Sequence, residues 1–264
     1  MESSFWSKIT PNENAKQAGF RFGDKGTHTS LTIMLNELND LMNTVPVNVK
    51  RDDYAKAIID ENVLGKSTAS TRKAYNQRMG ELYALDLGVP IFRILRRLWD
   101  IDEEGRPLIA MLCALARDPL LRSTASSVIS LSAGDELIRH NYLYEIKSAT
   151  GDRLNDMSID KVARNTGSSW TQSGHLDGRF RKIRKLAKPT VCTVAYALWM
   201  GSLFNFSGEK LFTSPWMKIL DCNRDEIIEH TLHAKRLRLL DANIGGGVVE
   251  INPTCIDPDM EVLY

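Results

Sequence analysis

The sequence predicts a mainly α-helical protein with two helix-turn-helix-like units, the C-terminal one a winged helix with a small β-hairpin. Apolar residues recur at helical spacing through most of the 264 residues. Two stretches have the order of a short helix, a turn and a second helix. Near the C-terminus, alternating residues flank three consecutive glycines after three expected helices, which is the order of a winged helix.

The composition is that of a folded globular protein. Hydrophobic residues make up 43% and charged residues 25% of the chain. The formal net charge of +1 excludes a strongly basic field over the whole protein, so an electrostatic partner must be attracted by a local patch. The four cysteines form no CxxC pair, and the chain shows neither a signal peptide nor a long apolar run. We therefore expect a cytoplasmic protein with reduced thiols and no membrane partner.

The length favours two closely packed domains over one. We expect a polar leader over residues 1–27, an N-terminal helical domain over 28–132 that contains the first helix-turn-helix-like unit, and a C-terminal domain over 133–264 that contains the winged helix. No linker rich in Pro, Gly or Ser marks the boundary.

In the N-terminal half, helices are expected over residues 29–43 and 51–62, followed by a basic helix that starts at a Ser67 cap and runs to about Leu85. The next helix, within residues 88–102, groups Arg93, Arg96 and Arg97 on one surface. Residues 106–117 are apolar almost all round, which suits a central helix.

Basic residues outnumber acidic ones seven to three between Leu64 and Asp100. Those near the basic helix are of types that contact phosphates and base edges. The alternative interpretation is that they only form a solvated helix face. The predicted contacts of this first surface are Lys66, Arg72, Lys73, Asn76 and Arg78.

The second half starts with expected helices from Pro119 to about Ser132 and from there to Gly151. A short helix from Ser158, a turn at Gly167 and a further helix with Trp170 give the second helix-turn-helix outline. A basic run follows it, and nine basic residues face four acidic ones between Gly151 and Lys188. The predicted contacts of this second surface are Trp170, Arg179, Arg181, Lys182, Arg184 and Lys185, with Phe180 as a weaker candidate.

The C-terminal region predicts a buried helix after Pro189, a second one broken by Pro215, and a third capped by Asn223. Residues 239–253 then form the hairpin around the glycines. Ten acidic residues outnumber six basic ones from residue 207 onward, so this region is acidic.

Catalysis is not expected. Ser169, Ser173 and His175 have the residue types of a nucleophile and its base, but no GxSxG elbow accompanies them. His230 and His233 lie three apart on a helix, but without the HExxH order or a carboxylate cluster. We expect no metal and no cofactor.

The stretch AIIDENVLGKSTASTRKAYNQRMGELYALD, with the apolar helix SLTIMLNELNDLMN before it, resembles the N-terminal part of the BrxA family of bacterial BREX phage-defence systems. In both, an acidic-Asn-x-Leu turn precedes a Thr-rich cap and a basic helix. The residues of this chain that carry the resemblance are Glu61, Asn62, Leu64, Thr68, Ala69, Ser70, Thr71 and Arg72. The resemblance covers about residues 29–86 and implies a small helical accessory protein that binds DNA and meets other defence-system proteins.

The preferred hypothesis is a non-catalytic nucleic-acid-binding protein, with double-stranded DNA as the preferred ligand. Its two basic surfaces would contact the phosphate backbone of the nucleic acid. The alternative is a protein-interaction adaptor of a defence complex that docks through its acidic C-terminal region or the Arg93 surface. A third hypothesis, a hydrolase, requires Ser169 and His175 within hydrogen-bond reach of each other.

Overall fold

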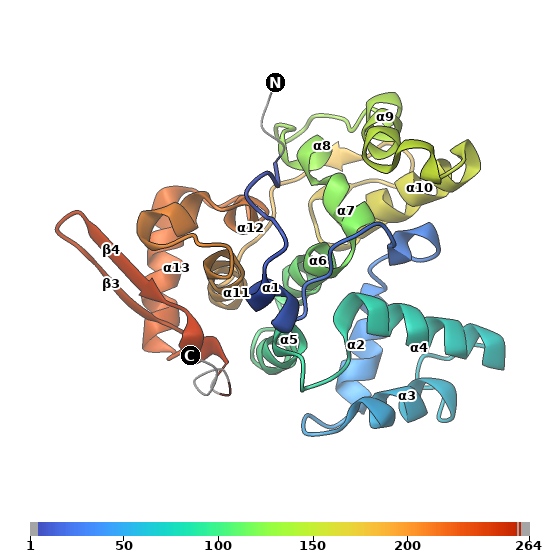
Figure 1. The fold of residues 1–264 in the computed structure, drawn as a ribbon, viewed down its shortest axis with the longest axis horizontal. Helices are drawn as coiled ribbons and strands as arrows, with labels where there is room; N and C mark the ends of the chain where they lie inside the picture. The colour runs from blue at the N-terminus through green and yellow to red at the C-terminus, as the bar shows by residue number, and fades with distance from the viewer. Residues whose placement is uncertain (1–4, 258, 260–264) are drawn as a thin grey trace.

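A computed structural model describes residues 5–257 and residue 259. The protein is mainly helical, as predicted, with two small antiparallel hairpins (Figure 1). Its centre is formed by α6 (Arg106–Arg117) and α11 (Val191–Ser202), and nearly every side chain of both is buried because both sequences are apolar all round. No helix in this described part has the length and apolar character needed to cross a bilayer.

The segment predicted as a polar leader supplies core side chains. Ile9 is buried, as is Ala15 in the short helix α1 (Glu13–Gln17). The ring of Phe20 lies 5.2 Å from that of Phe204 and 5.4 Å from that of Trp216, centroid to centroid. The buried side chains form one cluster that reaches from residue 9 to residue 256, and the division at residue 132 stays a prediction.

After the 3₁₀ turn η1 (Thr27–Thr29), α2 spans Leu35–Thr44 rather than beginning at Thr29. Contacts with a later helix cause the difference. The backbone N–H of Ile33 donates to Ser169 Oγ at 3.0 Å, and that of Leu35 donates to Gln172 Oε1 at 3.0 Å. These bonds replace a first helical turn.

Helices α3 (Arg51–Ile59) and α4 (Ala69–Tyr83) pack against each other where the sequence predicts two helices and a turn, and their assignment as a helix-turn-helix unit stays a prediction. The turn between them is ordered by the buried Leu64 and by Asn62, whose Oδ1 accepts the N–H of Lys66 at 2.8 Å. The cap of α4 is Thr68, which accepts the N–H of Thr71 at 3.1 Å; the predicted Ser67 cap is wrong by one residue.

The arginines of α5 (Pro90–Ile101) do not share a free surface, so that prediction is wrong. Arg97 donates at 2.8 Å to the carbonyl of Ile256, the last residue of the 3₁₀ turn η4 (Thr254–Ile256). Arg93 donates at 2.8 Å to both carboxylate oxygens of Asp257, the next residue. Arg96 is buried and donates to the carbonyls of Met42 and Val45. All three hold the chain together.

The helices in the middle of the chain differ from the prediction: the first is divided in two, and a later one is longer than predicted. The expected helix after Pro119 is two short ones, α7 (Pro119–Ser123) and α8 (Ala125–Ile129). After α9 (Arg139–Thr150) and η2 (Gly151–Arg153), α10 spans Asp156–Gln172 without a break. The predicted turn at Gly167 is therefore wrong, and so is the helix-turn-helix outline built on it.

The basic run after α10 forms a hairpin, β1 (Leu176–Asp177) with β2 (Ile183–Arg184), and not a helix. In each of these two short strands, one side chain is more buried than its neighbour, as in a strand and not as in a helix. Residues 134–137 lie along the other edge of β2, where the N–H of Leu137 donates to the carbonyl of Lys182 at 2.8 Å and Glu136 pairs with Ile183.

The C-terminal elements follow the predicted order. Beyond α11 come η3 (Gly208–Thr213), α12 (Pro215–Lys218) and α13 (Arg224–Arg236), and the predicted Asn223 cap is confirmed by its bonds to two backbone N–H groups. The hairpin β3 (Asp241–Gly245) and β4 (Val248–Asn252) projects beside α13 and turns at Gly246 and Gly247, both with positive φ (Figure 1). Three helices and a hairpin in this order are the parts of a winged helix.

Candidate nucleic-acid interface

One face of α4 is exposed and carries small and polar side chains. Ser70, Lys73, Ala74 and Gln77 lie at i, i+3, i+4 and i+7, so they share that face. The opposite face buries Met79, Leu82 and Tyr83 against the body of the protein. Helix α4 thus offers a polar surface, and its N-terminal end is exposed.

The charge of this surface is positive. No acidic residue occurs between Asn62 and Gly80 in the sequence. Lys73 is exposed and Arg72 half-buried, and neither forms an ion pair with any residue that the structure describes. These two cations are the part of the first predicted surface that is left for a ligand.

Other predicted contacts of the first surface bind within the protein. Lys66 lies 2.9 Å from Glu37 Oε1 and 4.4 Å from the centroid of the Tyr75 ring. Asn76 accepts a hydrogen bond from Arg51 at 2.8 Å.

Arg78 also has an internal partner, since it lies 2.8 Å from Glu81. Hydrogen bonds from Arg78, Gln77 and Thr27 keep the pKa of Glu81 low against the burial that opposes ionisation, so this carboxylate is charged and offsets the arginine.

The second surface is the loop of residues 178–182, named here the finger, which joins β1 to β2. Arg179, Phe180 and Arg181 are all exposed, and 89% of Phe180 is open to solvent. Arg181 donates from Nε at 3.0 Å and Nη2 at 2.6 Å to one oxygen of Glu136 while remaining 78% exposed. Lys182 donates to Thr171 Oγ1 at 2.8 Å, and Lys185 lies 3.7 Å from Asp177.

Two predicted contacts of the second surface are wrong because they are buried. The indole of Trp170 is fully enclosed, and its Nε1 donates to Thr124 Oγ1 at 2.8 Å, so the ring has no face for a base. The side chain of Arg184 is 1% exposed and lies 2.5 Å from Asp221, with which it forms a buried ion pair.

The winged-helix part has a different character. The N-terminal half of α13 bears Asp225, Glu226 and Glu229 on its exposed side, and the hairpin bears Asp241 and Glu250. Exposed apolar side chains accompany them, namely Leu232, Leu237 and Val248. Exposed Lys235, Arg236 and Arg238 follow at the C-terminal end of α13, so the charge of this surface is mixed.

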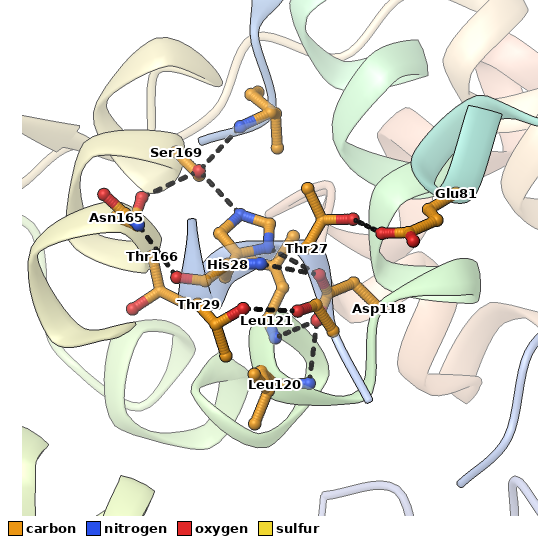
Figure 2. A network of polar contacts seen from close by, with 12 residues as sticks. Thr27, His28, Thr29, Glu81, Asp118, Leu120, Leu121, Asn165, Thr166 and Ser169 are labelled. Atoms are coloured by element: carbon orange, nitrogen blue, oxygen red, sulfur yellow. Dashed lines mark hydrogen bonds and ion pairs between the residues drawn. The ribbon is translucent and has the colours of Figure 1, made fainter. Parts of the chain in front are cut away.

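A buried polar network connects the helix-turn-helix pair to the C-terminal half (Figure 2). His28 lies between Asp118, whose Oδ2 is 2.8 Å from its Nδ1, and Ser169, whose Oγ is 2.8 Å from its Nε2. The neighbouring Thr27 donates to Glu81 of α4 at 3.0 Å, and Asn165 of α10 donates to the carbonyl of His28 at 2.8 Å. Although burial opposes it, the contacts with His28 and the backbone N–H groups hold the pKa of Asp118 below its usual value.

The residue types Ser, His and Asp are those of a hydrolytic triad, but this network has no access to a substrate. All three side chains are buried, and Ser169 lies inside a regular helix with its Oγ also bonded to the N–H of Ile33 and the carbonyl of Asn165. A nucleophile requires an exposed Oγ beside groups that stabilise the oxyanion. The network therefore serves to fix η1 between α4, α7 and α10.

The predicted pair of Ser169 and His175 does not form. His175 instead accepts at Nδ1 from Ser173, at 2.8 Å, and donates from Nε2 to the carbonyl of Ile219 at 2.7 Å. Burial lowers the pKa of His175 to about 4, which leaves the ring neutral. The hydrolase hypothesis required a hydrogen bond between Ser169 and His175, and it is therefore wrong.

Within the described residues, no three His, Cys, Asp or Glu side chains gather as metal ligands. The chain matches no family model, and a comparison with curated proteins finds no match. The resemblance of residues 29–86 to the BrxA family stays a prediction.

Proposed function

We propose that the protein is a non-catalytic, intracellular DNA-binding protein that grips double-stranded DNA through α4 and through the finger. The observation that carries this proposal is the exposed face of α4, on which Lys73 stands among small residues without an ion-pair partner in the described chain, one turn before Gln77, which donates to Glu81 at 3.0 Å. Lysine and glutamine contact phosphates and base edges, and small residues let the helix approach the groove closely.

Several features support the choice of duplex DNA. The helix-turn-helix pair offers its second helix from the N-terminal end, and the finger adds Arg179 and Arg181. The low net charge of +1 is compatible with such binding because the positive charge is concentrated in these two places. The resemblance to the BrxA family supports an accessory role beside other phage-defence proteins.

The test is binding of the purified protein to a random-sequence duplex between roughly 50 and 200 mM salt, since each phosphate contact adds about one to the slope of log affinity against log salt. Replacement of Lys73 by Ala should reduce the slope by about one. A matched control is Lys16→Ala, which removes an exposed lysine of α1 that faces Glu13. If Lys73→Ala leaves the affinity and its salt dependence at the wild-type values, α4 is not the contact.

The finger is tested by the double change Arg179→Ala and Lys182→Ala. Arg184 is left intact because its replacement would strand the carboxylate of Asp221 in the interior. A slope that falls in this variant supports the second surface, and an unchanged slope removes it from the proposal.

A second candidate function is favoured by the surface of α13 and the β3–β4 hairpin. Its mixture of acidic, basic and exposed apolar side chains has the character of a protein-binding surface. The chain would then be an adaptor that docks through its winged-helix part. Absence of any duplex binding at low salt, together with a stoichiometric partner lost on Leu237→Glu, would establish this function in place of the first.

A further inference from the structure

Phe180 at the tip of the finger is the most exposed large apolar side chain in the part of the chain that the structure describes. Its ring is 89% open to solvent, while the other phenylalanines of the described residues are buried or half-buried. This ring stands at a loop tip beside the guanidinium of Arg179, and a partner that covered it would remove its apolar surface from water.

The loop that carries this ring is anchored to the rest of the protein. Its first residue, Gly178, has φ of +95°, and a Cβ there would lie 2.1 Å from the carbonyl oxygen of Arg181, so the loop folds tightly back on itself. The side chain of Arg181 is bonded twice to Glu136, and the carbonyl of Lys182 accepts the N–H of Leu137. Both sides of the loop are thus anchored, and only the ring at its tip is left without contacts to the body.

The charges around the ring select a polyanion. The guanidinium of Arg179 lies 5.3 Å from the centroid of the Phe180 ring, and Arg181 follows it in the chain. Arg181 is paired with Glu136, so Arg179 is the cation of the finger that is left for a ligand. An apolar tip beside a cation has the chemistry of side chains that enter the minor groove, where an apolar wedge separates two base pairs while arginines contact the phosphates or the groove.

Single-stranded nucleic acid is the less suitable ligand. Platforms for unpaired bases stack successive bases on several aromatic rings. The finger has one aromatic residue, and the nearest tryptophan in the sequence, Trp170, is buried.

We propose that the finger inserts the ring of Phe180 between two adjacent base pairs of double-stranded DNA and bends the duplex at that step. This inference rests on the proposed function. It adds to that function a deformation of the DNA, so the site would prefer flexible pyrimidine–purine steps such as TA.

The experiment uses the full-length protein and a duplex labelled with a fluorescence donor at one end and an acceptor at the other. Energy transfer reports the end-to-end distance, and the anisotropy of the same duplex reports binding. Wild-type protein should shorten the distance by an amount that corresponds to a bend of roughly 20 to 90°. Phe180→Ala should abolish the bend and weaken binding by less than about tenfold, because the cationic contacts remain.

Two further variants sharpen the result. Phe180→Leu keeps an apolar wedge and should retain most of the bend, since leucine also acts as a wedge. Val248→Ala removes an exposed apolar side chain from the tip of the other hairpin and should leave both binding and bend unchanged.

The outcomes separate the two proposals. Duplex binding with a bend that Phe180→Ala leaves intact, or with no bend in the wild type, overturns the wedge but not the DNA-binding function. If Phe180→Ala weakens binding to a single-stranded oligonucleotide more than binding to the duplex, the ring contacts unpaired bases. This outcome also overturns the wedge. Absence of any duplex binding by the wild type at low salt overturns both.

Discussion

His175 illustrates how a single buried side chain makes the stability of this protein depend on pH. Its ring is neutral in the folded state because burial lowers its pKa from 6.5 to about 4, and its two nitrogens bind Ser173 and the carbonyl of Ile219. Between these two values the unfolded chain binds a proton that the folded chain does not. The free energy of unfolding is therefore highest above pH 6.5 with respect to this group, and it falls as the pH is lowered towards 4, by at most about 3 kcal/mol.

The measurement is urea unfolding of the wild type and of His175→Gln at several pH values across this window. The variant keeps a polar side chain without the titration, so its curve of stability against pH should be flatter than that of the wild type. Parallel curves for the two proteins would contradict the assignment.

Residue type and spacing could not rank the aromatic residues near the basic run. Trp170 and Phe180 are close to the same cations in the sequence, and a larger ring is the better stacking surface, which favoured Trp170. The structure buries the tryptophan and exposes the phenylalanine because the run is a hairpin with a tip. Likewise Gln77, rather than Asn76, faces solvent on α4, since Asn76 turns to Arg51.

At the scale of elements, the continuity of α10 has a direct test at Gly167. This residue lies in the interior of the helix with ordinary helical backbone, and a Cβ built on it meets no atom within 4 Å. Replacement by alanine should raise the free energy of unfolding by roughly 0.5 to 1 kcal/mol, because the unfolded chain loses conformational freedom and the folded one gains no clash.

The matched control is Gly178→Ala, at which a positive φ and the nearby carbonyl of Arg181 make any side chain unfavourable. The two alanine variants should shift the urea midpoint in opposite directions. If Gly167→Ala lowers the midpoint as well, residue 167 is not in an unstrained helix.

Helices α5 and α13 were predictable because an apolar stripe decides which face is buried, and α6 and α11 because they are apolar all round; all four appear where the pattern places them. The basic run was not, since long-range pairing of residues 134–137 with β2 determines that it is extended. The late start of α2 has the same kind of origin, because the backbone N–H groups of Ile33 and Leu35 donate to Ser169 and Gln172. Local spacing carries no information about such partners.

On the scale of the whole molecule, the N-terminal segment and the C-terminal half should unfold together. Phe20 is 4% exposed and packs against Phe204 and Trp216, and the indole Nε1–H of Trp6 donates to the carbonyl of Arg122. Phe20→Ala should therefore lower the free energy of unfolding by about 3 to 5 kcal/mol.

The same change at Phe180, which is exposed, should leave the stability close to that of the wild type. Tryptophan fluorescence and far-UV circular dichroism should give coincident transitions in both variants, since one cluster of buried side chains spans the described chain. Separate transitions would show that the segment is an independent unit.

The ion pair between Arg93 and Asp257 also constrains the order in which a newly synthesised chain can become native. The residues that it joins are 164 positions apart, and Asn12 and His28 likewise meet partners more than a hundred residues downstream, at Leu203 and Ser169. A ribosome releases the first helices long before those partners exist. These contacts of the early part of the chain cannot form until translation has passed their partners, the last of them Asp257. The time that the early part spends incompletely packed, and open to chaperones, is therefore set by the speed of elongation.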